Sequence, residues 1–438
     1  MTGNGYIEPD ERTTLLPRAR SHHRRHSSRL SRISTTTTAD HPWLKDSRFW
    51  VRCPAQVANI VWVTLMSNYV HVLLVFVPLG IIAGALKWSP SAVFTLNFFA
   101  IMPLASLLSF ATEELAAVMG QTLGGLMNAT FGNAVELIVS IVALKDNQIR
   151  VVQASMLGSI LSNILLVLGC CFLAGGLRYH EQSFNSTVAS TMSSLMAVAS
   201  ASLIIPATLF AALSSSYDAD SETTRNNILF LSRGTSIILL ALYVMYLYFQ
   251  LRSHNDLFED VHAEECPSEE LGEEHQEETH ILNPFAAGIA LIVVTILVAV
   301  CAEYLVGSIE GIVERTGMSR TFIGLVLIPI VGNAAEHVTA IVVAYKNKMD
   351  LAIGVAIGSS LQIALFVTPF LVILGWILNV EMTLHFHIFE TMAFFISGLV
   401  VTLLIQDGKS NYLEGGLCLG MYLILAIAFY VYPDDVPQ

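Results

Sequence analysis

The sequence predicts an all-α, polytopic membrane protein with eleven transmembrane helices, arranged as one helix followed by two five-helix repeats of inverted topology. Three observations carry this prediction. The 438 residues are 54% hydrophobic and 13% charged, whereas soluble proteins carry about 25% charged residues. The apolar residues lie in runs long enough to cross a bilayer, which takes about 20 residues of helix. Short motifs also recur 200 residues apart.

The N-terminal region is polar and basic. Residues 1–52 hold ten Lys and Arg against five Asp and Glu, together with runs of Ser and Thr. This composition buries little apolar surface and predicts a disordered cytosolic tail over residues 1–56. No apolar run follows the early charges, so a secretory signal peptide is not expected. Residues 57–87 are predicted to form an interfacial segment and the first transmembrane helix.

The predicted spans are separated by short segments that carry Pro, Gly and charged residues, which favour turns. The eleven spans are 68–87, 91–111, 122–144, 151–173, 188–213, 228–251, 284–306, 321–344, 351–378, 385–405 and 412–432.

The distribution of Lys and Arg predicts the orientation, because cytosolic loops carry an excess of them. A cytosolic N-terminus assigns 15 of the 22 Lys and Arg to the cytosolic side, and the basic tail alone decides this score. The orientation places residues 253–282 in the cytosol after six crossings, and the C-terminal tail, 434–438, on the far side of the membrane, which is the lumenal side if the membrane is that of an organelle.

Two motifs repeat at a constant spacing. Phe131–Glu136 (FGNAVE) recurs as Val331–Glu336 (VGNAAE), and Leu157–Leu161 (LGSIL) recurs as Ile357–Leu361 (IGSSL). Residues 88–252 and 283–433 are therefore predicted to be two copies of five spans each. Because five is odd, successive copies have opposite orientations, which is typical of secondary transporters with a central binding site.

Two carboxylates are predicted inside apolar helices, one in each repeat. Glu136 and Glu336 each follow an Asn by three residues, so that Asn133 and Asn333 lie on the same helix faces as the carboxylates. A buried carboxylate is costly unless it is neutralised, which favours a functional role. Oxygen ligands with two negative charges suit Ca²⁺ above all, with Mn²⁺ as an alternative. Interhelical hydrogen bonding is the other interpretation of the two amides.

Further polar residues surround this predicted metal site. Ser159 with Asn163, and Ser359 with Gln362, each share a helix face and either complete the cation shell, pass protons or join helices. His337 adjoins Glu336 and is a proton-pathway candidate. Glu113 and Glu303, near span ends, are candidates for ion access, or are simply solvated helix ends.

The sequence has no complete ATP-binding motif, which bears on the energy source of transport. Gly408-Lys409-Ser410 imitates the end of a Walker A motif, but Leu403 stands where Gly is required. ATP-driven pumping therefore loses support, and no cofactor is expected. An ion gradient remains, and competition between a cation and protons for the same two glutamates is the simplest antiport mechanism.

The acidic segment accounts for most of the net charge of −13, since Asp256 to Glu278 supply eleven acidic residues and no Lys or Arg. It is predicted to be a cytosolic linker between the repeats. Two roles stay open: a solvated linker, or an electrostatic funnel and ion sensor. The candidate regulatory residues are Glu264, Glu265, Glu273 and Glu274.

The motifs resemble the signatures of a known family. Gly332–His337, Ala344–Leu351 and Gly358–Ile363 resemble the second signature of the vacuolar Ca²⁺/H⁺ exchangers of fungal type, in the Ca²⁺/cation antiporter superfamily, and Gly132–Glu136 resembles the first. The resemblance covers about residues 68–432. It implies an acidic linker helix and antiport of cytosolic Ca²⁺ against H⁺ at the vacuole membrane. It also implies that Glu136 and Glu336 are the central ligands.

Other functions remain as alternatives. The chain could be an exchanger driven by Na⁺ or K⁺, an exchanger for a broader set of divalent cations, or a passive cation channel. The expected partners are Ca²⁺, H⁺ and the lipid bilayer, without nucleic acid, and a homo-oligomer stays open.

Overall fold

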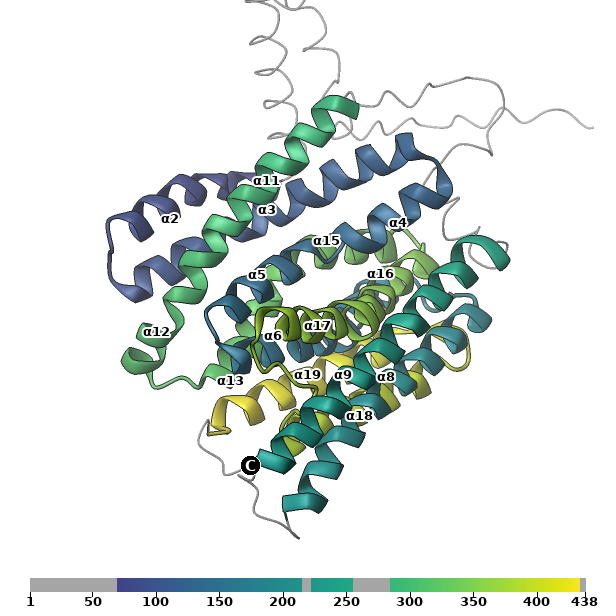
Figure 1. The fold of residues 1–438 in the computed structure, drawn as a ribbon. Helices are drawn as coiled ribbons and strands as arrows, with labels where there is room; N and C mark the ends of the chain where they lie inside the picture. The colour runs from purple at the N-terminus through teal and green to yellow at the C-terminus, as the bar shows by residue number, and fades with distance from the viewer. Residues whose placement is uncertain (1–68, 215–221, 255–283, 434–438) are drawn as a thin grey trace, which may run out of the picture. The chain divides into compact units, whose positions relative to one another are not determined.

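The computed structural model describes residues 69–214, 222–254 and 284–433 (Figure 1). These residues all belong to one compact unit, Val63–Gln438. The predicted N-terminal tail, most of the interfacial segment, the acidic linker with Glu264, Glu265, Glu273 and Glu274, and the tail 434–438 lie outside the described residues.

The described elements are almost all helical, in agreement with the predicted class. The first part of the chain forms η2 (Tyr69–Val75), α2 (Phe76–Ala85), α3 (Pro90–Met119), α4 (Gln121–Phe131), α5 (Ala134–Lys145), α6 (Ile149–Leu161), η3 (Ser162–Val167), α7 (Leu168–Arg178), β1 (Gln182–Ser183), α8 (Ser186–Ser214), α9 (Glu222–Tyr248) and η4 (Phe249–Ser253). The second part forms α11 (Pro284–Gly307), α12 (Ile309–Thr316), α13 (Arg320–Phe322), η6 (Ile323–Leu327), α14 (Ile328–Gly332), α15 (Ala334–Tyr345), α16 (Met349–Gln362), η7 (Ile363–Val367), α17 (Thr368–Leu378), α18 (Ile388–Leu404), β2 (Lys409–Ser410) and α19 (Tyr412–Val431).

Seven helices in the described part are long and apolar enough to cross a membrane. A further helix pair, Arg320–Gly332 and Ala334–Tyr345, passes this test together but is bent by 58°. Val70–Ala85 and Ile388–Leu404 are shorter apolar helices, and the predicted span 122–144 is split into α4 and α5. The all-α membrane class is therefore confirmed, while the number of eleven crossings stays a prediction.

The repeat predicted from the motifs is present in the helices. α5 and α15 have 12 residues each and begin 200 residues apart. α6 and α16 follow, then the π-helical segments η3 and η7, then α7 and α17. Asn147 and Asn347 both turn the chain with positive φ, 57° and 66°. The two copies therefore share one backbone design.

The copies run in opposite directions, as the odd number of predicted spans requires. The start of α6 meets the start of α18, where Arg150 pairs with Glu390. The start of α16 instead meets the start of α8, where Asp350 Oδ1 accepts a 2.7 Å hydrogen bond from the backbone N–H of Asn185. We call these two places the Arg150 end (loops 146–148, 317–319 and 379–387) and the Asp350 end (loops 179–185, 346–348 and 405–411).

Each repeat has a helix break immediately before its buried glutamate. Asn133 (φ −102°, ψ 30°) separates α4 from α5, and Asn333 (φ −81°, ψ 8°) separates α14 from α15. Both residues lie near the sparsely populated bridge region of backbone space. The first copy breaks without a proline, since Ala129 stands where the second copy has Pro329. Pro329 lies inside the helix Arg320–Gly332, directly after the π-helical segment η6, and the helix continues past it to Gly332.

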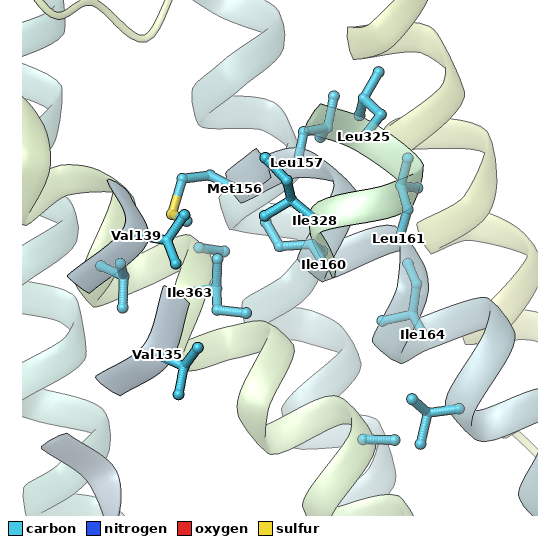
Figure 2. Packing of buried hydrophobic residues seen from close by; sticks show 14 of the residues in the cluster. Val135, Val139, Met156, Leu157, Ile160, Leu161, Ile164, Leu325, Ile328 and Ile363 are labelled. Atoms are coloured by element: carbon cyan, nitrogen blue, oxygen red, sulfur yellow. The ribbon is translucent and has the colours of Figure 1, made fainter. Parts of the chain in front are cut away.

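The core joins the two repeats around these breaks. Figure 2 shows apolar side chains of α5, α6 and η3 from the first repeat packed with those of η6, α14 and η7 from the second. Gly158 of α6 permits the closest approach, since a Cβ atom there would overlap the backbone of Leu325 in η6. α3 and α11 pack along each other and complete the surroundings of the breaks (Figure 1).

Candidate functional site

The two glutamates occupy equivalent positions at the beginnings of short helices. Glu136 and Glu336 are each the third residue of their helix, α5 and α15. Free backbone N–H groups and the helix dipole make this position favourable for a negative charge. Glu136 is only 4% exposed, and Glu336 is half-buried. The breaks at Asn133 and Asn333 thus create two helix N-termini inside the protein.

Donors from both repeats surround Glu336. Its Oε2 accepts hydrogen bonds from Asn163 Nδ2 (3.1 Å) and from Ser359 Oγ (3.0 Å). Ser359 Oγ also lies 2.7 Å from Asn133 Oδ1. A hydroxyl has one proton, so Ser359 can donate to Glu336 or to Asn133 but not to both at once. Ser359 is therefore a switchable donor between the two halves of the site.

The two asparagines also bond across the repeats. Asn133 Nδ2 donates to Gln362 Oε1 (2.6 Å), and Asn333 Nδ2 donates to Asn163 Oδ1 (2.9 Å) and to the carbonyl of Ser159 (3.3 Å). Both asparagines are fully buried. The amides thus make the interhelical bonds that were one of their two interpretations, and they do so within the predicted site.

Several buried oxygens in the site have no hydrogen-bond partner among the described residues. They are Glu136 Oε1, Ser159 Oγ and Asn333 Oδ1. Glu136 and Ser159 line a small cavity, with room of about 10 Å³. Its remaining walls are apolar side chains of α3, α5, α11 and α14, together with Gly332. Buried acceptors without donors are costly unless a ligand satisfies them, and hard cations prefer such oxygens.

Gly332 brings the second repeat against the carboxylate of the first. A Cβ atom at Gly332 would lie 2.6 Å from Glu136 Oε1, closer than real contacts allow. In the other half, a Cβ atom at Gly132 would meet the carbonyl oxygen of Asn128 in its own repeat at 2.7 Å, and Gln362 Oε1 of the second repeat only at 3.7 Å. The glycines of the repeated motif are thus placed at the interface of the two halves, and the requirement for glycine beside the carboxylate is specific to Gly332.

His337 lies at the edge of the site. Its Nδ1 is 2.7 Å from the carbonyl of Asn333, and its Nε2 has no partner in the described part of the chain. A carbonyl only accepts, so Nδ1 carries the proton and the neutral ring has an open acceptor at Nε2. This geometry can take up a proton, but the role of His337 in proton transfer stays a prediction.

Glu113 and Glu303, the predicted access residues, are exposed on α3 and α11. Glu113 Oε1 accepts a hydrogen bond from Ser109 Oγ (2.9 Å). The structure thus assigns both to the surfaces of helices that also line the cavity, and their role in access stays a prediction. The sequence reasoning missed the cavity-lining residues Phe98, Ile101 and Leu305, because an apolar residue in an apolar span carries no distinguishing signal.

The site depends on amides and hydroxyls as well as charges. Among the described residues, no three His, Cys, Asp or Glu side chains are grouped as a metal site. A cation between the repeats would therefore use the two carboxylates together with neutral oxygens from the side chains around them. Such a set suits a transported ion, which must be bound and also released.

Two inverted repeats whose broken helices bring buried carboxylates together define a secondary transporter for cations. Sequence comparison agrees and specifies the family. The chain belongs to the sodium/calcium exchanger protein family, whose model matches residues 89–252 and 286–431.

The relatives of this chain are similar over most of its length. It is 50% identical over 379 residues to the vacuolar calcium ion transporter of Schizosaccharomyces pombe, covering 86% of this chain and 89% of the relative. It is 44% identical to the Ca²⁺/H⁺ antiporter of Aphanothece halophytica, covering 82% and 96%. The solved structure of selenium-substituted YfkE, a Ca²⁺/H⁺ antiporter, superimposes with a TM-score of 0.67 at 37% identity, covering 82% and 98%.

Proposed function

We propose that this chain is a secondary antiporter that exchanges cytosolic Ca²⁺ for vacuolar H⁺ and so sequesters Ca²⁺ in the vacuole. The observation that carries the proposal is a pair of carboxylates, the buried Glu136 and the half-buried Glu336, each just after a helix break, beside a cavity whose oxygens lack hydrogen-bond partners among the described residues. The relatives named as vacuolar calcium transporters and Ca²⁺/H⁺ antiporters support the same ions and the same membrane.

The charge of the two carboxylates explains coupling. Two ionised glutamates in a low-dielectric site are costly unless their charge is compensated. One Ca²⁺ compensates both charges, and so does protonation of both carboxyl groups. The loaded states are thus neutral and can reorient between the two sides, while the empty ionised site cannot do so at comparable cost. Ca²⁺ and protons therefore exchange instead of leaking.

The surrounding polar groups complete the proposed cycle. Asn133 and Asn333 contribute amide oxygens beside the carboxylates, and Ser159 offers a hydroxyl that has no partner in the described part of the chain. Asn163 and Ser359, which now donate to Glu336, stabilise its ionised form before the cation arrives. Gln362 holds Asn133, and His337 accepts protons at the edge of the site. No resident cofactor is needed, and Mn²⁺ has the charge and ligand preferences to compete for the site.

The membrane arrangement belongs to the same proposal. Eleven crossings with a cytosolic N-terminus put the C-terminus in the vacuolar lumen and the acidic linker in the cytosol. The energy comes from the proton gradient of the vacuole, since the sequence has no Walker A motif.

Proteoliposomes with an acidic interior test the function. The proposal expects uptake of ⁴⁵Ca²⁺ that collapses when the pH gradient is dissipated and that excess Mn²⁺ reduces. Uptake that follows an imposed Na⁺ or K⁺ gradient instead would identify the other exchanger class. Flux that ignores every gradient except that of Ca²⁺ would identify a channel and overturn the proposal.

A further inference from the structure

A buried ion pair lies at the Arg150 end, away from the two glutamates of the site. The side chain of Glu390, in the first turn of α18, is fully buried. Arg150 binds both of its oxygens: Nη1 donates to Oε2 (3.1 Å) and Nη2 donates to Oε1. The backbone N–H of His387 also donates to Oε2 (3.2 Å). The negative charge of a buried carboxylate must be compensated, so this ion pair differs from an exposed surface ion pair, whose loss costs little.

Arg150 also reaches a third helix. Its Nη2 donates to Thr321 Oγ1 (3.2 Å) in α13. α13 leads through η6 and α14 to Gly332 and Asn333 at the site, and α6, which carries Arg150, leads to Ser159. A single guanidinium group therefore joins the starts of the two packed segments that supply cavity-lining residues from both repeats.

The equivalent position in the other repeat lacks this connection. Asp350, 200 residues after Arg150, accepts from the backbone of Asn185 at the start of α8. α6 packs along α13, η6 and α14, whereas no comparably extensive contact joins α16 to α4 in the described part of the chain. Gly158 is packed against Leu325, while Gly358 has open space beside it. Among the described residues, the segment α13–η6–α14 is thus packed tightly against α6 at the Arg150 end, whereas α4 is not packed in this way against α16 in the other repeat.

We propose that Arg150 and Glu390, acting through Thr321, are positioning residues that hold α13–η6–α14 against α6 and keep the site closed at the Arg150 end. This inference rests on the proposed function. The Arg150–Glu390 pair stays intact through the transport cycle, since separating it would leave a buried charge uncompensated. The hydrogen bond from Arg150 to the uncharged hydroxyl of Thr321 is the contact that breaks when this end opens.

We call the connection of Arg150, Glu390 and Thr321 the clamp. Thr321→Val tests the clamp because it removes the hydroxyl of Thr321 and keeps the side chain's size and the charges of the ion pair. Thr391→Val is the matched control: Thr391 is a buried threonine of α18 at the same end, and its hydroxyl bonds only to the carbonyl of His387 within that helix among the described contacts. Each variant is combined with Ile328→Cys, a buried cavity-lining position in α14, in a chain whose native cysteines are replaced. Lys87→Cys, exposed in the loop before α3, marks the Arg150 side of sealed vesicles, because Pro90 at the start of α3 packs against Gly311 of α12, close to the loop 317–319.

The measurement is the rate at which a membrane-impermeant thiol reagent labels Ile328→Cys from the Arg150 side. Thr321→Val is expected to raise this rate by about tenfold, the factor that corresponds to loss of one hydrogen bond to a charged group, and Thr391→Val is expected to leave it unchanged. Equal rates in the two variants would overturn the clamp.

Labelling does not require transport, so the clamp and the proposed function fail separately. If proteoliposomes show no proton-driven Ca²⁺ uptake but Thr321→Val still raises the labelling rate, the clamp is supported and the proposed exchange of Ca²⁺ for H⁺ is rejected. A second pair of variants checks the ion pair itself. Arg150→Glu alone should raise the labelling rate of Ile328→Cys from the Arg150 side, and the exchange Arg150→Glu with Glu390→Arg should restore the low rate. If the exchanged protein is folded but keeps the high labelling rate, Glu390 has no part in the proposal.

Discussion

Glu136 and Glu336 belong to the same repeated motif but have different surroundings. Glu336 is half-buried and accepts hydrogen bonds from Asn163 and Ser359. Glu136 is 4% exposed, its Oε1 has no hydrogen-bond partner among the described residues, and Gly332 is packed against it. One motif thus produces a carboxylate that is already solvated by protein donors and another that still needs a partner. The two glutamates are chemically equivalent but have different surroundings. This is expected of a single conformation of a transporter with inverted repeats, because the two repeats are then packed differently.

The largest expected effect comes from neutralising either carboxylate. Glu136→Gln or Glu336→Gln leaves one negative charge for a divalent cation and removes the neutral loaded state. Proton-driven ⁴⁵Ca²⁺ uptake in proteoliposomes should fall to the background of empty liposomes in both variants. Glu314→Gln, an exposed glutamate of α12, is the matched control and should keep uptake. Uptake that survives in only one of the two variants would show that a single carboxylate carries the ion.

A smaller but still large effect is expected at the glycine that faces Glu136. Gly332→Ala places a methyl group 2.6 Å from the present position of Glu136 Oε1, and overpacking of this kind costs about 1–3 kcal/mol. Ca²⁺ affinity should therefore fall by about tenfold, as measured by equilibrium binding to the purified protein. Gly307→Ala in α11, where nothing lies within 4 Å, should bind normally. Normal binding by Gly332→Ala would mean that the close approach is not part of the Ca²⁺-bound site.

The repeat made much of this site predictable. The constant spacing paired Asn133 with Asn333 and Ser159 with Ser359, and the structure brings all the predicted central residues together. The broken symmetry was harder to predict, since Asn163 is matched by Ile363 and Gln362 by Ser162, so the second amide is displaced by one residue. The ion pair at the Arg150 end was not predicted at all. Its partners are 240 residues apart, and Asp350 in place of a second arginine removes any repeat signal.

This displaced amide gives the finest test of the comparison between the glutamates. Asn163→Ala removes a donor to Glu336, and a hydrogen bond to a charged group contributes about 1.5–3 kcal/mol. Gln362→Ala removes only a neutral bond to Asn133, which contributes about 0.5–1.5 kcal/mol. The apparent KM for Ca²⁺ should thus rise by about tenfold or more in Asn163→Ala and by only a few-fold in Gln362→Ala.

The order of these two effects decides between two explanations of the asymmetry. If the donors around Glu336 prepare it for the cation, Asn163→Ala must be the weaker transporter at low Ca²⁺, and saturating Ca²⁺ should largely restore its maximal rate. If Gln362→Ala has the larger KM, the anchoring of Asn133 matters more than the solvation of Glu336. Glu136, which has fewer protein donors, would then be the carboxylate that binds the arriving ion first.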